Sequence, residues 1–147
     1  MTFVSRADDE TYTDDFLRTI LISVKTIALV GLSANPARPS HYVFEFLQRR
    51  GYRMVGVNPG LAGEEIFGAP IYARLEDIPF PVDMIDIFRN SDAAGGVVDE
   101  ALMLSPKPNV IWMQLDVRND AAAQRARAQG LKVVMNRCPK IEIPRLL

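Results

Sequence analysis

An apolar run, a turn-rich loop and a helix start follow one another between residues 26 and 41, and this order constrains the fold most strongly. Residues 26–30 read Thr-Ile-Ala-Leu-Val, which is typical of a strand buried on both faces of a sheet. The following loop contains Gly31, Pro36 and Pro39, and a helix over 41–50 is predicted with Ser40 as its cap. Backbone N–H groups of the loop and the positive end of the helix dipole then meet in one place, which favours an anion.

The alternation of strand and helix continues along the chain and predicts the fold class. Strand, helix and strand between residues 26 and 57 fill about 30 residues, the size of a βαβ unit. The pattern predicts a three-layer α/β Rossmann-like fold, with a mainly parallel sheet and helices on both faces. The predicted strands are 25–31, 52–57, 70–72, 82–88, 109–115 and 131–135. The predicted helices are 13–25, 41–50, 91–104 and 121–129, and the tail 136–147 is a loop with a short extended or helical end.

The helix ends have recognisable signals. Thr13 is predicted to cap the first helix, Ser91 or Asp92 the third, and Asn119 or Asp120 the fourth. Gly51 is placed to follow the second helix in a left-handed conformation.

The length of 147 residues fits one domain, which we expect over residues 13–147 after a loose N-terminal arm over residues 1–12. With 48% hydrophobic and 24% charged residues, the chain can form a core without disulfides or a metal. The net charge of −1 argues against a nucleic-acid-binding protein that works through a basic surface.

The number of cysteines and the length of the apolar segments indicate where in the cell the protein works. The single cysteine, Cys138, excludes an intramolecular disulfide and favours a reducing compartment. The first ten residues lack the apolar segment of a signal peptide, and no apolar run approaches the roughly 20 residues that span a bilayer. We therefore expect a soluble, cytoplasmic protein without a membrane partner. One cysteine and one histidine, His41, argue against a metal site.

Ligands of open α/β sheets bind beyond the carboxyl ends of the strands, where the strand order reverses. The residues that follow the predicted strands are small or polar and include two arginines, which suits an anionic ligand. They are Leu32, Ser33, Ala34, Asn35, Asn58, Pro59, Arg89, Asn90, Asp116, Val117, Asn136, Arg137 and Cys138.

The loop departs from the dinucleotide fingerprint G-x-G-x-x-G, because the stretch Gly31–Pro36 keeps only the first glycine. The acid that would bind a ribose hydroxyl at the end of the second strand is replaced by Asn58-Pro59. These differences disfavour a nicotinamide cofactor in its usual pose. The loop is also longer than the dinucleotide version and contains Arg38, which fits a pyrophosphate with a further phosphate.

Several short motifs follow in a fixed order: VGLS at 30–33, RPS at 38–40, GY at 51–52, VNP at 57–59, LEDIP at 75–79, VD at 82–83, DIFR at 86–89, WMQL at 112–115 and VMNRCPK at 134–140. Together they resemble the small stand-alone CoA-binding proteins, which are similar to the CoA-binding domain of the succinyl-CoA synthetase α subunit. The resemblance spans about residues 20–147. No single motif is decisive, but their order and spacing are specific.

The resemblance implies a domain that holds the adenosine diphosphate part of coenzyme A or an acyl-CoA. It implies that Gly31, the loop Ser33-Ala34-Asn35 and the helix start Ser40-His41 take the pyrophosphate. It also implies that Asn58-Pro59 lies beside the adenosine, and that Phe88-Arg89-Asn90 lines the pantetheine or phosphate path.

One position departs from the synthetase pattern. The synthetase has a lysine shortly after the pair that matches Asn58-Pro59, where this chain has Leu61, so Arg38 or Arg89 is left to supply a cation. The synthetase also uses a second domain with a phosphorylated histidine, whereas His41 is the only histidine here and lies in the loop. Ligase activity is therefore not implied.

The sequence thus predicts a CoA-binding module whose ligand is a small molecule and in which no catalytic constellation is visible. Alternatives are an NAD(P)-linked oxidoreductase or redox-sensing module, a CoA-thioester transferase fragment, and an interaction module with a vestigial pocket. Whether the protein has a protein partner is left open by the sequence. Cys138 has three readings: a nucleophile, a thiol that pairs with CoA, or a packed cysteine.

Asp86 is the polar residue of the apolar strand 82–88, where an unpaired charge is costly. We expect it near the sheet end with a hydrogen-bond partner.

Overall fold

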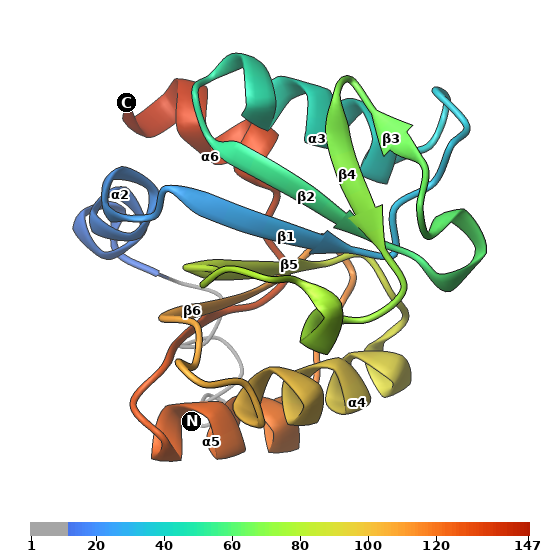
Figure 1. Cartoon of the computed structure of the whole chain (residues 1–147). Helices are drawn as coiled ribbons and strands as arrows, with labels where there is room; N and C mark the ends of the chain where they lie inside the picture. Colours follow the sequence, from blue (N-terminus) through green and yellow to red (C-terminus); the bar gives the residue numbers. More distant parts are fainter. Residues whose placement is uncertain (1–11) are drawn as a thin grey trace.

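Seven strands form the central sheet of the computed structural model, which describes residues 12–147. Their spatial order is β3-β4-β2-β1-β5-β6-β7, and all neighbours are parallel except β3 and β4, which form an antiparallel hairpin (Figure 1). The strands are β1 (Thr26–Val30), β2 (Arg53–Val57), β3 (Glu65–Ile66), β4 (Ala69–Tyr72), β5 (Met84–Ile87), β6 (Val110–Met113) and β7 (Lys132–Val134).

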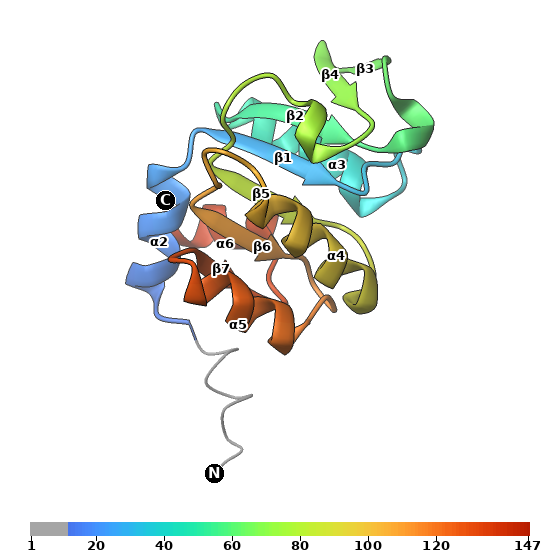
Figure 2. The same ribbon diagram turned by 60° about the horizontal axis from the view of Figure 1, so that its bottom comes forward.

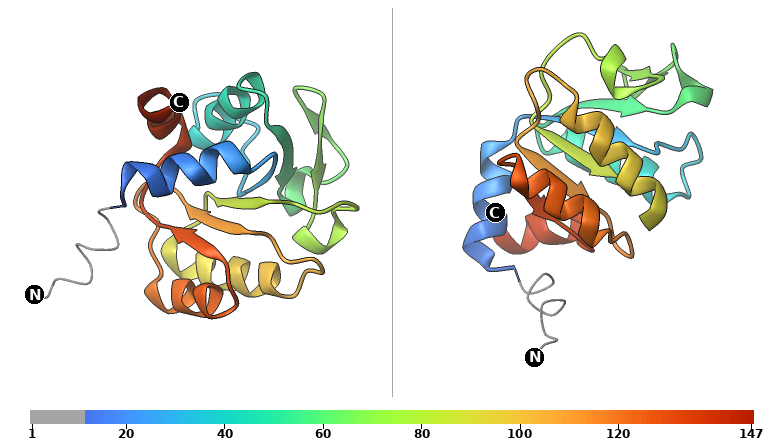
Figure 3. Two further views of the ribbon diagram at one scale, coloured as in Figure 1. Left: turned by 90° about the vertical axis from the view of Figure 1, so that its left-hand side faces the viewer. Right: turned by 90° about the horizontal axis from the view of Figure 1, so that it is seen from below.

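Helices cover both faces of this sheet, as Figure 3 shows with the sheet nearly edge-on. One face carries α2 (Asp14–Ser23), α3 (Pro39–Arg49) and α6 (Pro139–Leu146). The other carries α4 (Ser91–Leu102) and α5 (Asp120–Ala128), which lie next to one another (Figure 2). The predicted three-layer arrangement is confirmed. Among residues 12–147, no helix has both the length and the apolar character needed to cross a bilayer.

The continuous apolar sequence of β1 follows from this double cover. Ile27 and Leu29 belong to the core under α2, α3 and α6, whereas Ala28 and Val30 belong to the core under α4 and α5. Each of these four side chains is buried, because successive side chains of a strand point to opposite faces. A polar residue on either face of β1 would therefore enter a core.

The predicted caps of α2 and α5 are confirmed, and that of α4 is shifted. Thr13 Oγ1 accepts a hydrogen bond from the N–H of Phe16 (3.1 Å), and Asn119 Oδ1 accepts one from Ala122 (3.0 Å). The cap of α4 is Asn90, whose Oδ1 accepts from the N–H of Ala93 at 2.8 Å, and not Ser91 or Asp92.

Two segments gain structure that the sequence left undecided or missed. The turn-rich stretch between β2 and β4 contains η1 (Pro59–Leu61) and the two-residue strand β3, which is too short to have a periodicity. The end of the chain is the helix α6. Its Ile143 and Leu146 pack in the same core as α2, and Arg18 of α2 donates through Nε to the Leu146 carbonyl at 3.1 Å.

The predicted loose arm over residues 1–12 lies outside the described residues except for Tyr12. The Tyr12 hydroxyl accepts a hydrogen bond from the N–H of Met135 (2.8 Å), and its ring stacks on Phe16 with centroids 5.8 Å apart. Tyr12 thus packs on the domain.

The hydrogen-bond partner predicted for Asp86 is absent from residues 12–147. Asp86 lies in β5 between Leu29 of β1 and Trp112 of β6, and it is 0% exposed. Neither of its carboxyl oxygens has a hydrogen-bond partner within the described chain. Burial raises the pKa of the Asp86 carboxyl well above its usual range, so the core favours the protonated, neutral form.

Replacing Asp86 with asparagine is expected to make stability less sensitive to pH. The unfolded carboxyl ionises at its ordinary pKa while the folded one keeps its proton, so the natural protein loses stability as pH rises above about 4, by up to about 1.4 kcal/mol per pH unit until the folded pKa is reached. Asparagine titrates in neither state. The free energy of unfolding of D86N relative to the natural protein should therefore increase with pH, as measured by urea unfolding.

The matched control is Asp77→Asn, at an exposed carboxylate without an ion-pair partner among residues 12–147, and it should give no such increase. A difference between D86N and the natural protein that stays constant from acidic to neutral pH would contradict a protonated Asp86.

Candidate ligand-binding site

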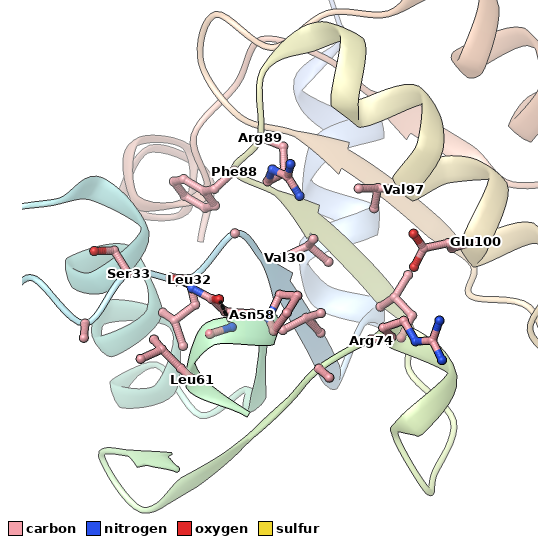
Figure 4. Close-up of a pocket in the computed structure, with 17 residues that line it drawn as sticks. Val30, Leu32, Ser33, Asn58, Leu61, Arg74, Phe88, Arg89, Val97 and Glu100 are labelled. Carbon is pink, nitrogen blue, oxygen red and sulfur yellow. Dashed lines mark hydrogen bonds between the residues drawn. The ribbon is translucent and has the colours of Figure 1, made fainter. Parts of the chain in front are cut away.

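A cavity of about 810 Å³ opens at the carboxyl edge of the sheet, where β1, β2, β4 and β5 end (Figure 4). The chain leaves β1 toward β2 on one side and returns to β5 on the other, so this is the point at which the strand order reverses. The lining residues are Val30, Gly31, Leu32, Ser33, Ala34, Val57, Asn58, Pro59, Gly60, Leu61, Ala73, Arg74, Leu75, Phe88, Arg89, Val97 and Glu100.

The turn after β1 depends on a glycine. Gly31 has φ of 94°, and its N–H donates to the Val57 carbonyl at 3.0 Å. A Cβ at this position would lie 2.3 Å from the carbonyl oxygen of Phe88, closer than real atoms approach. Only glycine therefore allows the loop to cross this close to the end of β5.

Hydrogen bonds within the loop hold its shape. The N–H of Ser33 donates to Ser40 Oγ (2.9 Å), that of Asn35 to Ser33 Oγ (3.1 Å), and that of Ala37 to Asn35 Oδ1 (3.0 Å). Within residues 12–147, the N–H groups of Leu32 and Ala34 have no acceptor, and both residues line the cavity. A ligand oxygen could thus pair with backbone donors that the loop itself does not use.

Ser40 has a different role from the predicted one. The cap of α3 is Arg38, without a side-chain hydrogen bond, and Pro39 is the first helical residue. The prediction of Ser40 as the cap is wrong because the fixed φ of Pro39 suits the first helical position, which starts the helix earlier. Ser40 is buried, and its hydroxyl accepts the Ser33 N–H, so it ties the loop to the helix.

The cavity brings together seven of the twelve predicted binding residues: Gly31, Ser33, Ala34, Asn58, Pro59, Phe88 and Arg89. The other five lie outside its lining. Asn35 and Arg38 are exposed on the loop, Ser40 is buried beneath it, and Asn90 caps α4. His41 packs edge-on against Phe67, with ring centroids 5.1 Å apart.

Asn58 joins β2 to the loop through both ends of its amide. Nδ2 donates to the Leu32 carbonyl at 2.7 Å, and Oδ1 accepts from the N–H of Gly60 at 2.8 Å. The side chain at the end of β2 is therefore used in positioning the loop and the turn of η1.

Two arginines line the cavity and reach it from different elements (Figure 4). Arg89 follows β5, and its Cδ lies beside Gly31, so its stem packs on the loop. No ion pair holds its guanidinium within the part of the chain that the structure describes. Arg74 precedes η2 (Leu75–Asp77), and its Nε lies 3.9 Å from a Glu76 oxygen on the surface. Glu100 of α4 adds a carboxylate to the lining.

Arg74 is the functional candidate that sequence reasoning missed. The end of β4 lies beside the end of β2, because the N–H of Asn58 donates to the Tyr72 carbonyl at 2.9 Å. Arg74 comes two residues later. The rule that ligands bind beyond strand ends points to Ala73 and Arg74 when it is applied to the predicted strand 70–72, so the signal was present.

Replacing Gly31 with alanine is expected to cost roughly 3 kcal/mol of stability or more, because the new methyl group meets the Phe88 carbonyl and the positive φ is strained. Gly51→Ala is the matched control: φ there is 101°, but nothing lies within 4 Å of the added Cβ, so only the strain of about 1–3 kcal/mol applies. Guanidinium chloride unfolding measures both losses. Equal losses would contradict the close approach at Gly31.

Comparison with known proteins shows the family of the chain. Residues 25–144 match the CoA binding domain family. YneT, an uncharacterised protein of Bacillus subtilis, is 35% identical over 125 residues, which cover 85% of this chain and 90% of that protein. A protein of Thermus thermophilus with a solved structure is 38% identical with a TM-score of 0.86, covering 92% of this chain and 100% of that one.

A larger enzyme shares the fold. The dinucleotide-forming acetyl-coenzyme A synthetase 1 of Ca. Korarchaeum cryptofilum superposes with a TM-score of 0.63 at 22% identity, over 82% of this chain and 27% of that one. Since the family match runs from the residue before β1 into α6, the protein belongs to the CoA-binding domain family.

Proposed function

We propose that this protein binds coenzyme A or an acyl-CoA in the cavity at the carboxyl edge of the sheet, and that the cavity catalyses no reaction. The observation that carries the proposal is the loop after β1, where two unpaired N–H groups belong to residues of a cavity that also contains two arginines. Unpaired backbone donors of a loop, with guanidinium groups nearby, favour phosphate oxygens. Among phosphorylated ligands, membership of the CoA-binding domain family supports coenzyme A or an acyl-CoA.

The arrangement of the lining residues suggests how the ligand lies. The pyrophosphate is proposed to contact the N–H groups of Leu32 and Ala34 together with Arg89, whose stem rests on Gly31. The adenosine is proposed to lie beside the Asn58-Pro59 turn, as the resemblance implies. Because Arg74 follows the strand hydrogen-bonded to Asn58, we assign it to the 3′-phosphate of the same adenosine.

The state of Asn58 supports CoA over a nicotinamide cofactor. Dinucleotide-binding domains use a carboxylate at the end of the second strand to accept hydrogen bonds from a ribose. Here the Asn58 oxygen already accepts from Gly60 and the nitrogen donates to Leu32. The side chain is thus occupied in holding the loop.

The composition of the cavity lining supports binding without catalysis. The lining residues within 12–147 include Glu100 but no histidine or cysteine. His41 packs against Phe67, away from the lining. The lining does include the Ser33 hydroxyl, but its oxygen accepts the Asn35 N–H, and no histidine of the lining accompanies it as a base for group transfer.

Titration of the purified protein with CoA by isothermal calorimetry is expected to give saturable binding, whereas NADH under the same conditions should give none. The difference follows from the occupied Asn58 amide and from the cations for a third phosphate. Tighter binding of NADH than of CoA would favour the oxidoreductase alternative. Binding of neither ligand would contradict the proposal and favour an interaction module.

Three arginine variants should separate the phosphate contacts when CoA is compared with 3′-dephospho-CoA. Arg74→Ala is expected to weaken CoA by about tenfold, or about 1.4 kcal/mol, and to leave 3′-dephospho-CoA unchanged. Arg89→Ala should weaken both ligands by a similar factor, because the pyrophosphate is common to them.

Arg38→Ala is the control for the loss of an exposed arginine close to the loop, and both affinities should be unchanged. A loss with Arg38→Ala that is specific for CoA would instead assign the 3′-phosphate to Arg38.

A further inference from the structure

A second cavity, of about 600 Å³, lies on the α3 and α6 side of the same sheet edge. Phe88 and Arg89 belong to the lining of both cavities, so the two cavities adjoin at these residues. A flexible chain that leaves the pyrophosphate at Arg89 enters the second cavity by passing over these two side chains. The part of coenzyme A beyond the pyrophosphate is such a chain: pantetheine, with two amides and a terminal thiol.

The lining of the second cavity contains an unsatisfied polar group. Gln114 follows β6 and is 6% exposed, and its Oε1 has no hydrogen-bond partner among residues 12–147. A buried acceptor without a donor destabilises the folded state. Because Oε1 itself is shielded from solvent, the Gln114 amide has to turn toward the cavity for an amide N–H of a bound ligand to supply the missing donor.

Apolar side chains around the same cavity are exposed to solvent. Tyr42, Leu115 and Ile141 line it and are 42%, 45% and 54% exposed. They come from α3, from the segment after β6 and from α6, and the fold brings them to one place. Exposed apolar side chains next to a polar acceptor suit a ligand that has both methylene groups and amides, such as pantetheine.

Cys138 lies in this lining together with Lys140. It is the single cysteine of the chain, it is 6% exposed, and it immediately precedes α6. Because Cys138 is otherwise buried, a reagent would reach its sulfur through the second cavity. The pantetheine path through Phe88, Arg89 and Gln114 thus leads toward a protein thiol.

We propose that Cys138 exchanges with a CoA disulfide and holds coenzyme A as a mixed disulfide. The inference rests on the proposed function, because the first cavity must bind the nucleotide end. The Cys138 thiol gives its proton to solvent, and the thiolate attacks one sulfur of the disulfide. A bond forms between Sγ and that sulfur as the original S–S bond breaks, and the second CoA leaves as a thiolate that takes up a proton. One disulfide replaces another, so the CoA disulfide is the oxidant that the step consumes.

The test follows the reduced full-length protein by intact mass spectrometry during reaction with CoA disulfide or glutathione disulfide. The CoA adduct should form at least about tenfold faster, because binding of the nucleotide places the disulfide beside Cys138. Adenosine 3′,5′-bisphosphate should slow the reaction of CoA disulfide and leave that of glutathione disulfide unchanged, and dithiothreitol should release the CoA. Equal rates for the two disulfides, or no CoA adduct, would overturn the inference.

Substitution of Gln114 tests the proposed pantetheine path without changing the Cys138 thiol. Gln114→Leu should slow adduct formation with CoA disulfide and not with glutathione disulfide, whereas Gln124→Leu on the exposed face of α5 is the matched control and should alter neither rate. Thermal melting checks that both variants fold. If Gln114→Leu does not fold, competition by adenosine 3′,5′-bisphosphate on the natural protein still tests whether the nucleotide site directs the exchange. Equal rates for Gln114→Leu and the natural chain would remove Gln114 from the path.

Calorimetry of Cys138→Ser with CoA distinguishes this inference from the proposed function. Retained CoA binding by Cys138→Ser, with no adduct on the natural protein, would overturn the exchange alone. Absence of both binding and adduct would overturn both proposals.

Discussion

The close contact between the backbone of Gly31 and the carbonyl of Phe88 is the constraint on which the site depends. At this point the loop after β1 crosses the end of β5, and a Cβ would lie 2.3 Å from the Phe88 oxygen. The same contact sets the first loop residues beside Arg89, whose stem lies against Gly31. A side chain at position 31 would separate the loop from β5, and thereby the backbone donors from the cation. The geometry that favours phosphate therefore begins with the absence of one methyl group.

The loop combines internal order with unused donors. Ser33, Asn35 and Ser40 accept hydrogen bonds within the segment, and Asn58 holds the Leu32 carbonyl from the next strand. These contacts position the backbone before any ligand arrives, so binding does not have to order it. A dinucleotide-binding loop does similar work with glycines and a carboxylate. Here polar side chains replace the missing glycines, and an asparagine replaces the acid.

Most of the fold was predictable because the strands are buried on both faces and the helices have one apolar side, which produces clear periodicity. Seven of the twelve predicted binding residues line one cavity, since strand ends meet at one edge of a parallel sheet. The roles of Ser40 and Asn90 differ from the prediction by a shift of a helix start, which Pro39 and the Asn90 side chain decide locally. Arg74 follows the predicted strand 70–72, but that its side chain shares a cavity with Arg89 depends on the pairing of β4 with β2. The lack of a partner for Asp86 depends on the side chains packed around it.

The sequence by itself determined the alternation of elements, the parallel sheet and the turn at Gly31, because periodicity and glycine conformation are local properties. Tertiary structure alone decided which strand ends are neighbours, and hence that Arg74 and Arg89 share a cavity while Arg38 lies outside it. It also decided that Gln114 and Cys138 line a second cavity that meets the first at Phe88 and Arg89. These relations join residues far apart in the chain, so no local pattern records them. The order of the strands in the sheet, β3-β4-β2-β1-β5-β6-β7, brings them together.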